Sequence, residues 1–225
     1  MVNYARAPDV DGFKRISFWR EGEIGIITLL PPGTIDKMSI AEFIQAISIA
    51  DNDDKVRALV VTGSNYVFSK GLSLPENITY ADLRDYYDSV KALAVFLISL
   101  EKPIFSAVNG TASNNGLALA LLCDEVFYSD NTKITLTDDE PRILLSSISY
   151  PRLLRSSGNG LRIEGVKLSE SNMMKDVMDI SENLLRIPYH IARKERFKGF
   201  ETVLLQEEID FLDFYLWCEG CRGKN

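Results

Sequence analysis

Three short runs of almost uninterrupted apolar residues limit the fold of this chain more than any other feature. They are Val56–Thr62, Ile104–Val108 and Glu125–Ser129. Short runs without polar alternation are typical of strands that are buried on both faces of a sheet. Because segments with helical character separate these runs, the sequence predicts an α/β fold with parallel strands and helices outside the sheet.

Two further strands precede these runs, at the start of the chain. Arg15–Trp19 and Ile24–Leu30 are rich in β-branched and aromatic residues, and the pair Glu21-Gly22 between them predicts a hairpin. Ser39, with Glu42 three residues later, has the pattern of a capping box and predicts the start of the next helix.

A long helix is predicted from about Tyr80 to Glu101, where Pro103 prevents its continuation. Gly116–Leu122 predicts a short, apolar helix, and Ser169–Asp179 predicts another with Ser169 as its N-cap. The expected buried face of the long helix consists of Leu83, Tyr86, Tyr87, Val90, Leu93, Ala94 and Leu97.

The composition argues against several classes of function. The chain has 225 residues and a formal charge of −7, whereas binding to nucleic acid needs a dense Lys/Arg surface. The longest apolar stretch, Ala92–Leu100, is too short to span a bilayer, and the first residues contain no apolar core of a signal peptide. We therefore expect a cytoplasmic protein that binds neither nucleic acid nor membranes.

Metal and hydrolase chemistry find little support in the sequence. Cys218 and Cys221 supply only two of the four ligands that a structural zinc site needs, so no metal site is predicted. The single histidine, His190, lies in the C-terminal helical region, which disfavours a Ser-His-Asp triad. No glycine-rich loop for a nucleotide is present.

Five segments, in the same order along the chain, resemble the crotonase (enoyl-CoA hydratase/isomerase) superfamily. Val60–Ser64 and Phe68–Leu72 resemble the family's strand and the glycine-containing loop that follows it. Glu101–Gly110 resembles its Lys-Pro strand that ends in Asn-Gly, and Gly116–Asp124 resembles its helix that ends in Cys-Asp. Ile163–Ser169 resembles a later segment of the family.

This resemblance implies a crotonase-like spiral of ββα units with a C-terminal helical appendage. It predicts a core with an acyl-CoA site over residues 1–140 and a mainly helical region over residues 141–225 that serves oligomerisation. Homotrimers, often paired into hexamers, are the expected assembly. The implied substrate is an acyl-CoA thioester, and no permanently bound cofactor is expected.

The family's reactions place negative charge on the thioester oxygen, and two backbone N–H groups hold that oxygen. The resemblance assigns these donors to Leu72, after Gly71, and to Asn115, before Gly116. Such a donor contributes about 3–4 kcal/mol to transition-state stabilisation. The family usually has glycine where this chain has Asn114 and Asn115, but asparagine tolerates left-handed backbone conformations better than most residues.

The acid/base residues depart from the family pattern. The first glutamate of the hydratases falls on Ala118, which cannot move a proton. The second falls on Asp138, Asp139 or Glu140, with Asp138 as the preferred register. One carboxylate suffices in principle for a double-bond shift, so isomerisation is favoured over hydration. Decarboxylation, or an inactive homologue that binds acyl-CoA or acts as an assembly partner, stays open as an alternative.

The expected contacts to coenzyme A come from nearby cations and glycines. Lys37, Lys70 and Arg20 are candidates for binding its phosphates, although surface lysines are often only solvated. Gly71 and Gly116 are expected to border the bound thioester. An apolar group is consistent either with an acyl pocket or with ordinary core: Leu74, Tyr80, Tyr86 and Leu121.

Overall fold

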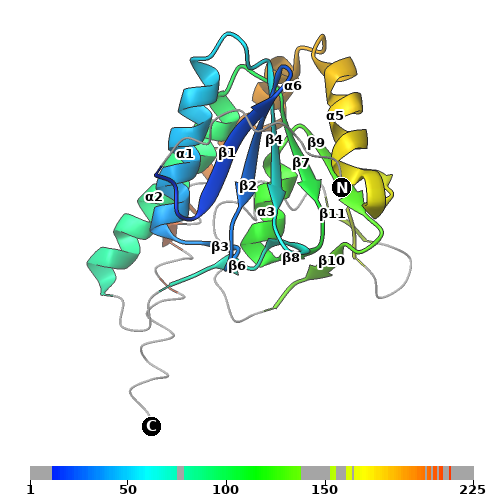
Figure 1. Cartoon of the computed structure of the whole chain (residues 1–225). Coiled ribbons are helices and arrows are strands. Elements are labelled where there is room, and N and C mark those ends of the chain that lie inside the picture. The colour runs from blue at the N-terminus through cyan, green and yellow to red at the C-terminus, as the bar shows by residue number, and fades with distance from the viewer. Residues whose placement is uncertain are drawn as a thin grey trace.

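The computed structural model describes residues 12–74, 79–137, 153–155, 161–163 and 165–200, together with scattered positions up to residue 213. A six-stranded sheet runs through the middle of the molecule, with helices α1 and α2 on one side and α5 on the other (Figure 1). This arrangement confirms the predicted α/β class. Among the described residues, no helix is both long and apolar enough to cross a bilayer.

The six-stranded sheet has the order β1-β2-β4-β7-β9-β13. Its first pair is antiparallel, and every other pair is parallel. The hairpin and the three buried strands predicted from the sequence are therefore confirmed. The strands are β1 Ile16–Glu21, β2 Ile24–Leu29, β4 Ala58–Gly63, β7 Ile104–Val108, β9 Glu125–Ser129 and β13 Val166–Leu168.

Alternate residues of the central strands enter two different apolar clusters. Ile27 and Val61 belong to the cluster that contains α1, α2 and α3. Ile26 and Val60 belong to the cluster formed with α5 and α6 on the opposite face. Both faces of the sheet are thus buried, which explains why these strands show continuous apolar runs instead of polar alternation.

Short strands follow the long ones and form smaller sheets. β5 (Val67–Ser69), β8 (Thr111–Ser113) and β10 (Lys133–Thr135) pair in parallel as β10-β8-β5. β3 (Thr34–Ile35) pairs in parallel with β6 (Gly71–Leu72). The chain therefore repeats a long strand, a short strand and a helix, as the ββα spiral requires. An antiparallel pair, β11 (Leu153–Arg155) and β12 (Leu161–Ile163), follows later.

The helices are α1 (Lys37–Asp51), α2 (Tyr80–Ser99), α3 (Asn114–Leu122), α5 (Met173–Leu184) and α6 (Tyr189–Arg196). All seven residues predicted for the inner face of α2 are buried. Ser169 precedes a short 3₁₀ helix, Glu170–Asn172, and α5 begins only at Met173. The predicted N-cap at Ser169 is therefore wrong for α5.

The predicted cap of α1 is also wrong. Asp36 is the N-cap: its Oδ1 accepts from the N–H of Ser39 at 2.7 Å, and its own N–H donates to the Ser39 Oγ at 2.7 Å. Glu42 instead accepts from the backbone N–H groups of residues 14, 15 and 16, at 2.9, 2.7 and 3.2 Å. This carboxylate fixes the entry of the chain into β1.

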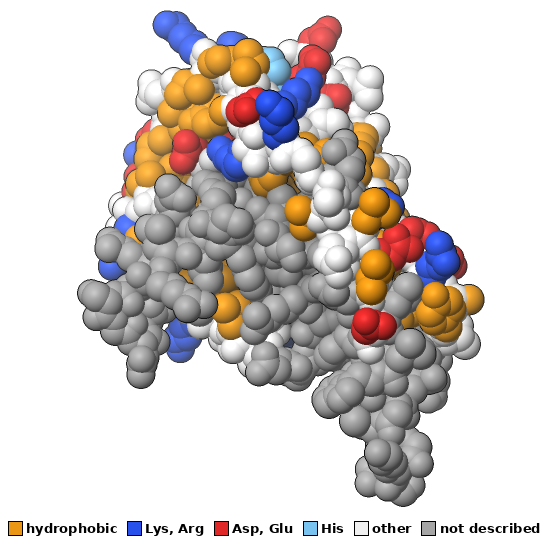
Figure 2. Space-filling view, turned by 180° about the vertical axis from the view of Figure 1, so that it is seen from behind, with side chains coloured by type: hydrophobic (Ala, Val, Ile, Leu, Met, Phe, Trp, Pro, Cys, Tyr) orange, Lys and Arg blue, Asp and Glu red, His pale blue; other side chains and the backbone are white. Residues whose placement is uncertain are grey.

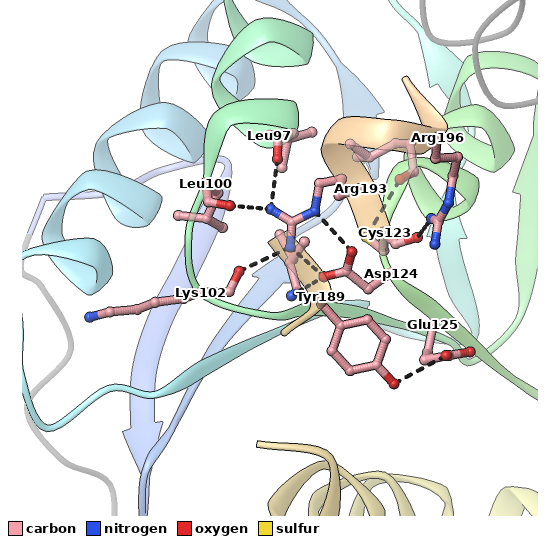
Figure 3. Close-up of polar contacts among 11 residues, drawn as sticks. Leu97, Leu100, Lys102, Cys123, Asp124, Glu125, Tyr189, Arg193 and Arg196 are labelled. Carbon is pink, nitrogen blue, oxygen red and sulfur yellow. Dashed lines mark hydrogen bonds and ion pairs between the residues drawn. The ribbon is translucent and has the colours of Figure 1, made fainter. Parts of the chain in front are cut away.

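A buried ion pair joins α6 to the rest of the core (Figure 3). The side chains of Arg193 and Asp124 are both fully buried. Arg193 Nε donates to Asp124 Oδ1 at 2.9 Å, and Nη2 donates to the other carboxylate oxygen. The remaining guanidinium N–H groups reach the carbonyl oxygens of Leu97, Leu100 and Lys102. One side chain thus ties α6 to the end of α2 and to the start of β9.

A groove lies between the β1–β2 hairpin and α5, with a volume of about 430 Å³. Trp19, Ile26 and Met178 are among the apolar residues that line it, and Glu21 and Glu182 are among the acidic ones. Burial, reinforced by the negative charge of Glu182, raises the pKa of Glu21 above its ordinary value. The ionised form of Glu21 is therefore less favourable in the folded protein than in the unfolded chain.

Removing one partner of the buried pair should destabilise the protein strongly. For Arg193→Ala we expect a loss of about 3–5 kcal/mol, because the Asp124 carboxylate would stay buried without its counter-charge. Urea unfolding at constant protein concentration measures this loss. Arg57→Ala is the matched control, since it removes an exposed pair with Glu23 at 3.3 Å and should cost less than about 1 kcal/mol. Equal losses for the two variants would contradict this role.

Glu21→Gln should stabilise the protein at neutral pH but not at low pH. Because the pKa of Glu21 is higher in the folded protein, Glu21 ionises at a lower pH in the unfolded chain. As pH rises, the free energy of unfolding therefore falls until the pH has passed the pKa of Glu21 in the folded protein. The variant avoids this loss, so its advantage should appear above the folded pKa and vanish below about pH 4. Thermal unfolding at several pH values measures it, with Glu182→Gln expected to give a smaller gain. The same gain at every pH would contradict this explanation.

Candidate active site

The start of α3 packs directly onto the last residue of β5, next to β6. A Cβ atom at Gly116 would lie 2.5 Å from both Cβ and Oγ of Ser69, and 2.9 Å from the Ser69 carbonyl oxygen. Only glycine permits this approach of helix and strand. Leu72 and Asn115, the two predicted donors, therefore lie on two backbone segments that touch each other.

The β6 side of this contact is held by backbone hydrogen bonds. The N–H of Lys70 donates to the Gly33 carbonyl at 2.7 Å, and the N–H of Ser73 donates to the Ile35 carbonyl at 3.0 Å. Gly71 has a φ of 91° and donates its N–H to the Ser69 Oγ at 3.2 Å. The turn needs glycine because other residues rarely adopt this conformation. Leu72 thus has a defined backbone position.

The α3 side starts with an asparagine in the left-handed region. Asn114 has a φ of 39° and is buried. Its Nδ2 donates to the Thr137 Oγ1 at 2.8 Å, and the Thr137 N–H donates back to the Asn114 Oδ1 at 2.8 Å. Ser113, the N-cap, makes no side-chain capping bond. Asn114 therefore adopts the left-handed conformation that asparagine is expected to tolerate.

No carboxylate comes from α3 itself. Ala118, the position to which the resemblance assigns the first glutamate of the hydratases, is fully buried in the apolar cluster with Leu117 and Leu119. Asp138, Asp139 and Glu140 lie outside the described residues. Thr137, which precedes them, is the residue bonded to Asn114.

The two predicted lysines lie in different surroundings. Lys70 is exposed and borders a hollow of about 180 Å³ that Pro31, Gly33 and Asn65 also line. Lys37, the first residue of α1, forms an exposed ion pair with Asp85 at 3.6 Å. Arg20 lies in the β1–β2 hairpin, at the amino ends of the parallel strands, and donates to the Gly22 carbonyl. Arg20 is therefore not at the same end of the strands as Lys70, which follows the carboxyl end of β5.

The four candidate pocket residues divide between core and surface. Tyr86 is buried and donates its hydroxyl to the Ile35 carbonyl, and Leu121 is fully buried, so both belong to the core. Tyr80 is 46% exposed, and Leu74 is half-buried. Tyr86 still contributes to the site indirectly, because Ile35 is in β3, the strand that pairs with β6.

The structure offers no obvious metal centre or triad in the part of the chain that it describes. Within those residues, no group of three or more His, Cys, Asp and Glu side chains is arranged to hold a metal ion. His190 lies in α6, and Cys218 and Cys221 fall outside the described residues. On the face opposite to that of Figure 1, the described Lys/Arg and Asp/Glu side chains are interspersed (Figure 2).

Two features of the site were missed by the sequence analysis. The bonds between Asn114 and Thr137 join residues 23 positions apart, and no local pattern marks such a pair. Ser69 was assigned only to a loop, yet its side chain faces Gly116 and accepts from Gly71. The signal for this role in the sequence was its place after Phe68 and two residues before Gly71, in the segment that resembles the family's loop.

Known proteins similar to this chain share its family and its fold. The family model described as Enoyl-CoA hydratase/isomerase matches residues 20–158. A protein named "Probable enoyl-CoA hydratase, mitochondrial", from Dictyostelium discoideum, is 26% identical over 228 residues, which covers 92% of this chain and 80% of that protein. "Enoyl-CoA delta isomerase 1, mitochondrial", from Rattus norvegicus, is 29% identical over 130 residues, which covers 55% of this chain and only 45% of the rat protein.

A solved structure gives the same answer for the fold. A crystal structure titled as an enoyl-CoA hydratase subunit I, from Geobacillus kaustophilus HTA426, has a TM-score of 0.67 at 22% identity. It covers 92% of this chain, and this chain covers 91% of it. The predicted crotonase-like fold is thus confirmed. The chain belongs to the enoyl-CoA hydratase/isomerase family, which acts on coenzyme A thioesters.

Proposed function

We propose that this protein binds an acyl-CoA thioester and stabilises its enolate with the backbone N–H groups of Leu72 and Asn115. The close packing of Gly116 on Ser69 is the observation that carries this proposal. It holds the two donor segments against each other, as two donors to a single oxygen require. The donors are main-chain groups, so the oxyanion site survives the side-chain differences from other family members.

The position of Asn115 adds to its strength as a donor. It is the second residue of α3, and helix N-terminal N–H groups carry the positive end of the helix dipole. Asn115 is 1% exposed, so water screens the developing charge weakly. A fixed donor of this kind contributes about 3–4 kcal/mol to the stability of the anion.

Isomerisation is the reaction that these residues support best. A carboxylate would remove a proton from C2 of a 3-enoyl thioester, and the charge would move to the thioester oxygen between the two donors. Return of the proton to C4 moves the double bond to C2–C3. Hydration needs two carboxylates to position and ionise a water, and Ala118 cannot serve as one of them. Asp138, Asp139 or Glu140 is the proposed base.

The remaining proposals concern coenzyme A and the assembly. Lys70 beside the hollow, with Gly71 and Gly116 at the thioester, is proposed to contact the bound substrate. Lys37 is the second candidate for a phosphate, although Asp85 already pairs with it. Coenzyme A is a substrate here, not a permanently bound cofactor. A cytoplasmic homotrimer or hexamer, with residues 141–225 at its contacts, completes the proposal.

A second candidate function is an inactive family member that binds acyl-CoA or serves as an assembly partner. The side chains of α3, a helix that the structure describes in full, favour this function. From Leu117 to Leu122 this helix carries only apolar side chains, all buried. If no carboxylate from the following segment reaches the site, the two donors would bind the thioester without turning it over.

Assays with two substrates separate these functions. We expect the full chain to convert 3-enoyl-CoA to its 2-enoyl isomer and to leave crotonyl-CoA unhydrated, because one carboxylate suffices only for the first reaction. Loss of the base should reduce turnover about 100-fold or more in one of three variants: Asp138→Asn, Asp139→Asn or Glu140→Gln. The appearance or loss of enoyl-thioester absorbance measures both reactions. Binding without turnover, unchanged by all three variants, would favour the inactive homologue.

Gly116→Ala should weaken acyl-CoA binding and destabilise the fold. The added Cβ forces α3 away from Ser69, and overpacking of this kind costs about 1–3 kcal/mol. Calorimetric titration with an acyl-CoA and urea unfolding measure the two effects. Ser69→Gly removes two of the three clashing atoms, so the double variant should recover part of both losses. Full wild-type binding by Gly116→Ala alone would rule out this contact as the basis of the site.

A further inference from the structure

We propose that Asn114 is a positioning residue, whose side chain fixes the direction of the Asn115 N–H group through a two-way hydrogen-bonded clamp to Thr137. This inference rests on the proposed function, since it assigns a role to a residue next to the proposed donor. It explains how this chain can place asparagine at a position where the family usually has glycine.

The clamp continues the pairing of two strands. β10 and β8 run in parallel, and their last paired residues are Thr135 and Ser113. One residue beyond Ser113, the Asn114 side chain takes over: Oδ1 accepts from the Thr137 N–H, and Nδ2 donates to the Thr137 Oγ1, each at 2.8 Å. Both polar atoms of the carboxamide are therefore used, and the side chain holds a single orientation.

The backbone of Asn114 decides where the next N–H group points. The peptide group between Asn114 and Asn115 is planar, so its orientation follows from the dihedral angles of Asn114. Asn114 lies in the left-handed region, with a φ of 39°, where few residues other than glycine are found. A glycine at this position would leave several orientations accessible. The clamp selects one of them and so fixes the Asn115 donor before any ligand arrives.

Asn114 is not itself a catalytic residue. Its carboxamide is occupied by Thr137, and Asn114 is only 6% exposed. Asn114 could matter because its side chain binds Thr137, or only because asparagine tolerates the left-handed conformation. Two variants distinguish these explanations. Asn114→Gly permits the same φ without the clamp. Thr137→Val removes the Oγ1 that accepts from Asn114, and its matched control, Thr137→Ser, keeps that oxygen.

The experiment compares the affinities of the full chain for acetoacetyl-CoA and for free CoA. Acetoacetyl-CoA has an acidic C2 and can place an enolate oxygen on the two donors, whereas free CoA cannot. We expect Asn114→Gly and Thr137→Val to reduce the affinity ratio about tenfold by weakening only acetoacetyl-CoA binding, because small misplacements at such sites are costly. Thr137→Ser should keep the wild-type ratio. Urea unfolding identifies any variant that is merely unfolded.

Amide hydrogen exchange tests the clamp without a ligand. The Thr137 amide should exchange slowly in the wild type and rapidly in Asn114→Gly, because its acceptor is gone. Fast exchange in the wild type would overturn the clamp. A wild-type affinity ratio retained by both variants would overturn the positioning role alone. A wild type that does not prefer acetoacetyl-CoA over free CoA would instead refute the proposed oxyanion site, and the inference with it.

Discussion

The ion pair between Asp124 and Arg193 fixes one end of the helix on which the proposed site depends. Asp124 follows α3 by two residues, and its side chain also accepts from the Ile104 N–H at 3.0 Å. A buried pair of this kind is costly to form unless hydrogen bonds satisfy the remaining polar atoms. The carbonyl groups around Arg193 supply those bonds. α3 is thus anchored at its carboxyl end by charge, and at its amino end by Gly116 and Asn114.

The sheet could be predicted from the sequence because the burial of each strand is visible in the residues of that strand alone. A strand with helices on both faces is apolar at nearly every position, and the three runs approach this pattern. The cap of α1 was missed for a different reason. Asp36 and Ser39 are both good N-cap residues, and Glu42 completes the pattern for Ser39. In the structure Ser39 completes the capping box of Asp36, while Glu42 bonds to residues 14–16, which are distant in sequence.

The same limit applies to the polar residues that hold the site. Arg193 stands in a run with Lys194 and Glu195, which resembles a solvated helix surface. Its burial follows from partners on α2 and β9 that no periodicity of α6 reveals. The family resemblance assigns the donors to Leu72 and Asn115, and this assignment stays a prediction. The resemblance could not locate the bonds of Asn114, since this chain departs from the family at that residue.

The apolar character of α3 has two opposite effects on chemistry. With only apolar side chains beyond Gly116, it surrounds the Asn115 donor with a medium of low polarity, in which a hydrogen bond to an oxyanion is stronger. The resemblance predicts a catalytic carboxylate of the hydratases at the position of Ala118, and this chain has none there. In the proposed function, the main-chain donors still stabilise an enolate, and the carboxylate for proton transfer comes from a segment other than α3. Thr137, which Asn114 binds, directly precedes the proposed base residues in the sequence. In the proposed site, the contact between Asn114 and Thr137 sets the direction of the oxyanion donor.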